Sequence, residues 1–416
     1  MKQRIESIEE NLLSFEEAET LVFSEASKAR LSTELCSLND CTGRILASDL
    51  SSDLDQPAAD NSAMDGYCFR RSDVPAMTKN GRITFPVSGR ILAGHPVESV
   101  PKGTAAYIAT GGIVPSEIDC IVKIEDISVS ENGKEISTAS VPPEGVYIRK
   151  RGQDIIKGAT LLKRGTHITP FCCGTIASMG VTNVPVVKRP SVAVVTSGDE
   201  VVMPFETPEP WQVRNSNSIT LSSQIKEAGG MAFDYGIIRD TCSSAEEIIE
   251  NSLSNCDILV TCGGVSLGEK DPFIAAFNSL NVKKIVHGVA IKPGKPFFFG
   301  EYKSKLIFGL PGNQASCAVT FEIFARPFIK RMLACTEPDR RSFFVRHTET
   351  IKNHTGRSIF MRGKLQTDQS GEIYSELFTK QESHMLSSLV NADLLAYIPG
   401  NVKILDNETK VRVRLL

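Results

Sequence analysis

Ser191-Val-Ala-Val-Val-Thr-Ser-Gly-Asp-Glu200 is a β-branched run that ends in small residues and two carboxylates. Asp257-Ile-Leu-Val-Thr-Cys-Gly-Gly-Val-Ser266 repeats this pattern, and Gly309-Leu-Pro-Gly-Asn-Gln-Ala-Ser316 follows a third apolar run. Continuous apolar runs are typical of buried parallel strands. Glycines after such strands let backbone N–H groups approach a ligand at the carboxyl ends of the strands. The three loops therefore predict one anion pocket, with Asp199 and Glu200 as candidate metal ligands.

The surrounding stretch, 186–335, alternates between strand and helix patterns. Strands are expected at 191–196, 231–238, 257–261, 282–286, 296–299 and 305–308. Helices are expected at 217–228, 243–254, 272–280 and 313–333. Asn217 or Ser218 is expected to cap the first helix, and Gly229 to end it. This alternation predicts a three-layer α/β domain with a mostly parallel sheet.

The flanking regions have a different sequence pattern. Residues 53–145 contain eight prolines between short β-like runs, which predicts a β domain inserted into an N-terminal α+β domain made of 1–52 and 146–185. In that N-terminal domain an amphipathic helix is expected over 6–28, with a second start at a Ser14–Glu17 capping box. Residues 336–416 alternate again and predict a C-terminal β domain that resembles a barrel.

Composition excludes several classes of protein. A chain of 416 residues is expected to form about two to four domains. A net charge of -3 argues against nucleic-acid binding. No apolar run reaches the roughly 18 residues that would span a membrane, and the start of the chain lacks a signal-peptide pattern. The 11 cysteines never form Cys-x-x-Cys, so we expect buried thiols in a reducing cytoplasm.

Charged residues cluster in the predicted loops of the α/β domain. Glu200, Asp240 and Asp271 each follow or approach a strand end, and hard oxygen ligands beside a phosphate pocket suit Mg²⁺. The alternative is that they are solvated loop acids. Lys292 and Lys295 lie on a turn stiffened by two prolines, Ala290-Ile-Lys-Pro-Gly-Lys-Pro-Phe297, which favours a fixed phosphate- or oxyanion-binding turn over an ordinary basic turn.

Several motifs together resemble the MoeA family of molybdopterin molybdenumtransferases, which also forms the C-terminal half of gephyrin. Besides the loops above, the matching stretches are Gly43-Arg-Ile-Leu-Ala, Asp60-Asn-Ser-Ala-Met-Asp-Gly-Tyr67, Thr110-Gly-Gly, Arg149-Lys-Arg-Gly-Gln-Asp154 and Gly236-Ile-Ile-Arg-Asp240. The α/β domain alone is similar to MogA, MoaB and CinA proteins, but the Asp60–Tyr67 block is not shared with them. Gln314 departs from the family, which usually has a second proline after Gly-Asn.

The resemblance implies a reaction in which adenylylated molybdopterin and molybdate give the molybdenum cofactor, AMP and water. It implies catalytic roles for Glu200, Asp65, Thr110 and Asp271, and Mg²⁺ held by Glu200, Asp240 and Asp271. The implied substrate-binding residues are Ser197, Gly198, Asp199, Gly263, Gly264, Ser266, Pro311, Gly312, Asn313, Lys292, Lys295 and Arg362. Arg362 could instead be a strand residue paired with a surface acid.

The resemblance also implies a homodimer in which Asp65 and Thr110 face the α/β pocket of the partner subunit. We expect the first domain, with the apolar stripe of its N-terminal helix, to build the dimer. A MogA-type adenylyltransferase and molybdoenzyme maturation proteins are further candidate partners.

Two other functions remain open at this point. A MogA-type adenylyltransferase would use the same pocket to load AMP, but it would need neither β domain. A gephyrin-like scaffold would need no intact carboxylate set. Ser197 and Ser266 lie in the predicted loops, yet none of the six histidines falls in a motif, so no nucleophile-and-base pair is predicted. Chemistry driven by a metal and by positioning fits this pattern.

Overall fold

The computed structural model describes residues 12–29, 31–265, 271–407 and 409–416. The chain divides into two compact units, each described here by itself. The first comprises residues 1–48, 164–170 and 183–416, and the second comprises 49–163 and 171–182. The four domain boundaries expected from the sequence stay a prediction.

A six-stranded sheet forms the centre of the first unit, in the order β17-β14-β18-β22-β21-β19. Its strands are β14 (Ser191–Ser197), β17 (Met231–Ile238), β18 (Ile258–Cys262), β19 (Lys283–His287), β21 (Phe298–Tyr302) and β22 (Lys305–Leu310). The pairs β14–β17, β14–β18 and β18–β22 are parallel, whereas β21 pairs antiparallel with both β22 and β19. The carboxyl ends of β14, β18 and β22 therefore meet at one edge.

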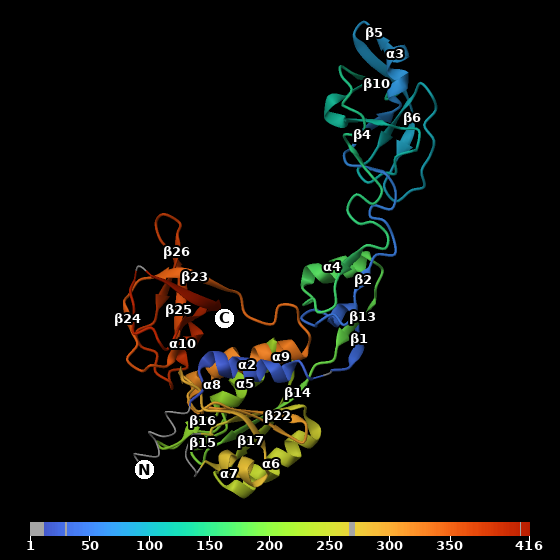
Figure 1. Cartoon of the computed structure of the whole chain (residues 1–416). Coiled ribbons are helices and arrows are strands. Elements are labelled where there is room, and N and C mark those ends of the chain that lie inside the picture. The colour runs from blue at the N-terminus through green and yellow to red at the C-terminus, as the bar shows by residue number, and fades with distance from the viewer. Residues whose placement is uncertain (1–11, 30, 266–270, 408) are drawn as a thin grey trace. The chain divides into compact units, whose positions relative to one another are not determined.

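Helices cover both faces of this sheet, which confirms the three layers (Figure 1). One face carries α5 (Ser216–Ala228), α8 (Gln314–Thr320), the π-helical turn η4 (Phe321–Ala325) and α9 (Arg326–Met332). The other carries α6 (Cys242–Asn255) and α7 (Pro272–Ser279). The helix start expected at Asn217 or Ser218 is wrong: the Asn215 side chain caps α5 by accepting the N–H of Ser218 at 3.1 Å. Gly229 ends α5 with a φ of 96°, as expected.

The N-terminal helix α2 (Phe15–Ala26) packs on the same core as α5 and α9. Its Ser14–Glu17 capping box is present. Phe15, Ala18, Val22 and Ala26 are all buried within this unit, and the Phe15 ring touches those of Phe324, Phe360 and Tyr397. The expectation that this apolar stripe needs a partner subunit is therefore wrong, because the chain covers it itself. Residues 6–11 of the expected helix lie outside the described residues.

The C-terminal region is a closed five-stranded barrel. Its strands are β23 (Ser342–His347), β25 (Ser358–Thr367), β26 (Ile373–Leu377), β27 (Leu394–Ile398) and β29 (Lys410–Leu415). The barrel closes because β25 pairs with both β26 and β27. The short β20 (Ile291–Lys292) leaves the α/β domain and pairs with β25. Smaller elements are α10 (Ser387–Val390) and the pair β24 (Ile351–Lys352) and β28 (Ile404–Leu405).

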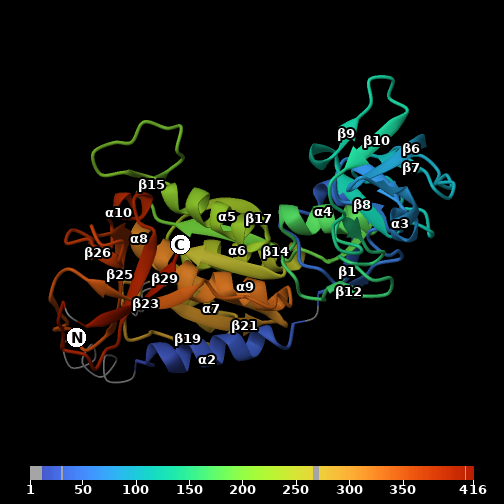
Figure 2. The same ribbon diagram turned by 90° about the horizontal axis from the view of Figure 1, so that it is seen from above.

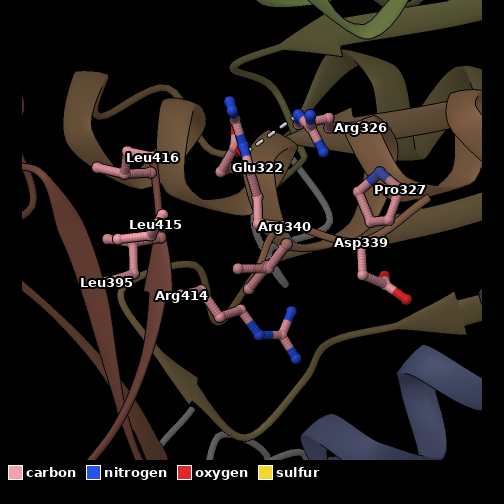
Figure 3. A pocket seen from close by; sticks show the side chains of 10 residues that line it. Glu322, Arg326, Pro327, Asp339, Arg340, Leu395, Arg414, Leu415 and Leu416 are labelled. Atoms are coloured by element: carbon pink, nitrogen blue, oxygen red, sulfur yellow. Dashed lines mark hydrogen bonds and ion pairs between the residues drawn. The ribbon is translucent and has the colours of Figure 1, made fainter. Parts of the chain in front are cut away.

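A partly buried group of ions joins α9 and η4 to the segment that leads into the barrel (Figure 3). The Glu322 carboxylate lies 3.4 Å from Arg326 Nε and 2.6 Å from Arg340 Nε. Glu227 pairs with the same two arginines. Glu322 and Arg326 are buried, so the loss of either would leave an uncompensated charge next to the segment where the barrel begins.

The first unit also contains a small ribbon and a long loop. The ribbon pairs β1 (Thr33–Ser37) with β13 (Asn183–Val187). The loop joins β15 (Val201–Val202) to β16 (Val213–Arg214) and projects beside the sheet (Figure 2).

The second unit is built around a seven-stranded sheet, in keeping with the β domain expected from the proline-rich stretch. The strands are β4 (Gly66–Phe69), β5 (Thr78–Lys79), β6 (Arg82–Ile91), β7 (Ala105–Ile108), β8 (Cys120–Lys123), β9 (Ser128–Val129) and β10 (Glu135–Thr138). The remaining elements are the pairs β3 (Asn61–Ser62) with β11 (Ile148–Arg149) and β2 (Leu50–Ser51) with β12 (Thr160–Leu162), and the helices α3 (Val74–Met77) and α4 (Pro170–Ser178).

Candidate active site

The three glycine loops meet in one cavity of about 650 Å³ at the carboxyl ends of β14, β18 and β22. Seven of the expected substrate-binding residues line it: Ser197, Gly198, Gly263, Gly264, Pro311, Gly312 and Asn313. The convergence expected from the strand patterns is thus what the structure shows. Ser266 lies outside the described residues.

Glycine is required at the β18 end because the neighbouring loop is too close for a side chain. A Cβ on Gly263 would lie 2.8 Å from the Ser197 carbonyl oxygen, and one on Gly264 would lie 2.7 Å from Ser197 Oγ. Both glycines also have positive φ values, 83° and 63°, which favour glycine. The loops therefore present bare backbone to the cavity, and backbone N–H groups at strand ends suit a phosphate.

Three carboxylates share this cavity. Glu200, Asp240 and Asp271 line it, whereas Asp199 does not and instead accepts the backbone N–H of Asp240 at 3.4 Å. Burial raises the pKa of Asp240 above its ordinary value, and the charges of Asp199 and Glu200 raise it further. Carboxylates that repel one another in this way provide a favourable site for a cation.

The fit to Mg²⁺ rests on this donor set of oxygens. The buried Ser197 hydroxyl makes no hydrogen bond of ordinary length among the described residues, and it lies near enough to Asp240 to favour its charged form. No group of three Asp, Glu, His or Cys side chains is already arranged as a metal site in the described part of the chain. Waters and substrate oxygens would complete the shell of a Mg²⁺ ion.

The expected oxyanion ligands lie in a second, adjoining cavity of about 800 Å³. Lys292, Lys295 and Arg362 all line it, because β20 carries the lysine turn onto β25 of the barrel. Pro296 and Asn313 line both cavities. The structure thus brings the three cations together, but beside the glycine loops rather than among them.

Arg362 is 1% exposed and is not paired with an acid among the described residues. Its Nε donates to Ser388 Oγ at 3.0 Å and its Nη2 donates to the Glu382 carbonyl at 3.1 Å. Burial lowers the pKa of Arg362 to about 10, so the side chain still carries its charge at neutral pH. A buried cation that only neutral groups contact is costly unless an anion joins it. The surface ion pair considered as an alternative is therefore absent from the described residues.

Sequence reasoning missed several residues of the two cavities. Lys352, Arg357 and Lys380 add positive charge to the second cavity, and Arg214 and His384 line the first. The first three come from distant positions around the barrel: Lys352 ends β24, Arg357 precedes β25 and Lys380 follows β26. Only the barrel topology would have located them.

Asp65 and Thr110 lie together in the second unit. The Thr110 backbone N–H and hydroxyl both donate to Asp65 Oδ1, at 2.7 and 2.9 Å. The backbone next to Asp65 packs closely against a neighbouring strand. A Cβ on Gly66 would lie 2.1 Å from the Val122 carbonyl oxygen, so only glycine fits after Asp65. Both side chains are exposed.

Family models match three consecutive regions of the chain. Residues 13–180 match the MoeA N-terminal region (domain I and II), 193–331 a probable molybdopterin binding domain, and 345–416 the MoeA C-terminal region (domain IV). A protein named molybdopterin molybdenumtransferase from Synechococcus elongatus is 33% identical over 97% of this chain and 100% of its own. The chain belongs to the MoeA family. A Haemophilus influenzae protein of the same name is 31% identical over 89% of this chain and 91% of its own.

Solved MoeA structures share the fold. A crystal structure of a molybdopterin biosynthesis moeA protein from Pyrococcus horikoshii covers 97% of this chain and 99% of its own, with a TM-score of 0.78 and 29% identity. A second covers 98% and 100%, with a TM-score of 0.83 and 24% identity, and shows the fold alone. The resemblance expected from the sequence is confirmed, as are the MoaB/MogA-like α/β domain and the C-terminal barrel.

Proposed function

We propose that the chain is a molybdopterin molybdenumtransferase, which inserts molybdate into adenylylated molybdopterin and forms Mo-molybdopterin with release of AMP. The observation that carries this is the pair of adjoining cavities. One has glycine loops and carboxylates for a phosphate-linked nucleotide. The other has the buried Arg362, which pairs with no acid in the described part of the chain, for an oxyanion. Family membership and the names of its relatives support the same reaction.

The residues have separate tasks in this proposal. Backbone groups around Gly198, Gly263 and Gly312 hold the phosphates, with Ser197, Asp199, Gly264, Ser266, Pro311 and Asn313 as neighbours. Lys292, Lys295 and Arg362 bind molybdate through charge-assisted hydrogen bonds. Glu200, Asp240 and Asp271 would hold Mg²⁺, which neutralises charge on the phosphates when it is bound. Positioning rather than a covalent intermediate drives the reaction.

The active form is proposed to be a homodimer in which Asp65 and Thr110 complete the site of the partner subunit. Their fixed, exposed pairing supports a role at a surface. Since the apolar stripe of α2 is buried within its own chain, the proposed dimer contact comes from other parts of the N-terminal region. The 11 cysteines, all among the described residues, are thiols and not disulfides, which supports a reducing cytoplasm as the location. No helix among the described residues is long and apolar enough to cross a membrane.

Two alternatives have less support. A MogA-type adenylyltransferase would leave the matches at 13–180 and 345–416 without a purpose, and a pure scaffold would not need two chemically distinct cavities. A MogA-type enzyme fits better as the supplier of the adenylylated substrate, and molybdoenzyme maturation proteins as recipients of the product.

The test is a single-turnover assay with adenylylated molybdopterin. Adding molybdate and Mg²⁺ should release one AMP per Mo-molybdopterin formed, and EDTA should stop the reaction. Full activity after exhaustive chelation would remove the Mg²⁺ role. Consumption of ATP with molybdopterin, giving adenylylated molybdopterin and pyrophosphate, would indicate the adenylyltransferase alternative instead.

A further inference from the structure

One segment of the barrel reaches both cavities. Residues 379–385, which we call the strap, connect the end of β26 to α10. We call the cavity at the three glycine loops the glycine-loop cavity, and the adjoining cavity lined by Lys292, Lys295 and Arg362 the cation cavity. His384 lines the glycine-loop cavity, whereas the cation cavity is lined by Thr379, Gln381 and Ser383. Among the described residues, His384 is the barrel's sole contribution to the glycine-loop cavity.

On the cation side, Arg362 holds the strap. Its backbone N–H donates to Gln381 Oε1 at 2.7 Å, and its Nη2 donates to the Glu382 carbonyl at 3.1 Å. Because Arg362 is itself buried, these two bonds fix the strap against a rigid strand.

On the glycine-loop side, Ser383 holds the strap. Its hydroxyl accepts from Asn313 Nδ2 at 3.1 Å, and its carbonyl accepts from the Ser316 N–H at 3.2 Å. Asn313 lies in the loop after β22, next to Pro311 and Gly312. The backbone of the next residue, His384, is therefore held in place because the strap is hydrogen-bonded on both the barrel side and the α/β side.

The glycine-loop cavity has few basic side chains that could bind an anionic ligand, and His384 is one of them. The described residues that line it include three carboxylates but just two basic side chains, Arg214 and His384. The ring Nδ1 of His384 lies 3.6 Å from the exposed Glu382 carboxylate, which leaves the other ring nitrogen for a ligand. A phosphoanhydride needs N–H donors, and imidazole supplies them without competing for the metal carboxylates.

We propose that His384 contacts the phosphates of the nucleotide-linked substrate in the glycine-loop cavity, and that Ser383 positions it. This proposal rests on the proposed function, since it assumes that an adenylylated substrate occupies this cavity. It assigns a binding residue from the C-terminal barrel to a cavity otherwise formed by the α/β domain.

The experiment measures AMP binding by calorimetry with Mg²⁺ present, together with KM and kcat for adenylylated molybdopterin. His384→Ala should weaken AMP binding about ten- to hundredfold, as expected for loss of a hydrogen bond to a charged group. His384→Lys should restore part of the affinity, because lysine supplies an N–H donor at the same position. The matched control is His354→Ala, an exposed histidine of the barrel that lines neither cavity.

The positioning role is tested by a double-mutant cycle. Ser383→Ala should weaken AMP binding less than His384→Ala, and the double variant should be no weaker than His384→Ala alone. Additive effects would overturn the positioning role. His384→Gln, which keeps the side chain's size, provides a folded variant if the alanine variant unfolds.

The outcomes separate the two proposals. Wild-type protein that neither binds AMP nor turns over the substrate would contradict the proposed function. Wild-type protein that does both, with His384→Ala and His384→Gln unchanged in AMP affinity and KM, would overturn the role of His384 alone.

Discussion

Thr110 donates two hydrogen bonds to one oxygen of Asp65, from its backbone N–H at 2.7 Å and its hydroxyl at 2.9 Å. These bonds, the backbone one first, lower the pKa of the Asp65 carboxyl below its ordinary value because they favour its charged form. Both residues are exposed, so the pair holds a negative charge at the surface and does not stabilise a core. A charge held in this way is available to a partner subunit.

Mixed dimers should reveal a shared site. Asp65→Ala and Glu200→Ala are each expected to be inactive alone. In a homodimer of either variant, both active sites lack one of the residues that they need. After subunit exchange, every mixed dimer should contain one intact site of its two, by subunit counting on a two-fold dimer. Turnover per mixed dimer should therefore return to about half of the wild-type value.

Exchange itself must be verified, for example with two affinity tags. Glu98→Ala, an exposed acid of the second unit, is the matched control and should stay active alone. No recovery in verified mixed dimers would show that each site lies within one chain.

Glu200→Ala should lower turnover by roughly a hundredfold or more while the protein stays folded. Glu200 is exposed and lines the glycine-loop cavity, so its loss removes a charge from the site without opening the core. Glu209→Ala is the control, since Glu209 lies in the neighbouring β15–β16 loop but does not line the cavity. The readouts are AMP release and the unfolding midpoint. Near-normal AMP release at physiological Mg²⁺ would contradict the role of Glu200.

The sequence predicted the α/β domain well because its strands are continuous apolar runs with glycines at their ends. Those local signals located Gly263, Gly312 and the carboxylates at one edge. The cation cavity could not be predicted as a separate space. Its position depends on β20 pairing with β25, a contact between segments more than sixty residues apart that no local pattern encodes.

Two further failures have physical causes. The apolar stripe of α2 indicates burial but not the burying surface, and the structure shows that its own α9 supplies it. His384 carries no motif because the strap has neither strand nor helix periodicity. The strap is held instead by hydrogen bonds from Arg362 to Glu382 and from Asn313 to Ser383.

Acid should remove a stabilising contact between the starts of β14 and β18. Asp257 accepts the Ser191 N–H at 2.9 Å and the Ser191 hydroxyl at 2.7 Å, and Lys305 lies 3.3 Å away. Burial acts to raise the pKa of Asp257, but these contacts outweigh it and the pKa is lowered. The stabilisation is therefore fully present above the ordinary Asp pKa of about 3.9 and is lost as pH falls through the lower folded value.

Asp257→Asn should accordingly lower the free energy of unfolding by about 1–2 kcal/mol at pH 7, after allowance for partial exposure. Urea denaturation at pH 7 and about pH 3 should show the difference from wild type shrinking in acid. Glu247→Gln on the exposed side of α6 serves as the control. A difference that is the same at both pH values would mean that the charge of Asp257 contributes nothing.

The unpaired cations of the second cavity should attract molybdate over a distance. Lys352, Arg357 and Lys380 line this cavity, and no described carboxylate lies within ion-pair distance of them, whereas Arg346 elsewhere in the barrel is paired with Asp368 and Glu372. Cations left unpaired around a cavity focus the electrostatic field and raise the rate at which anions enter.

Lys352→Gln and Lys380→Gln should each lower kcat/KM for molybdate roughly two- to fivefold at low ionic strength, with kcat unchanged. The difference should vanish near 1 M salt, where the screening length is about 3 Å. Lys410→Gln, on an exposed part of β29 outside the cavity, should behave as wild type. Equal salt dependence in all four proteins would show that these lysines do not guide the substrate.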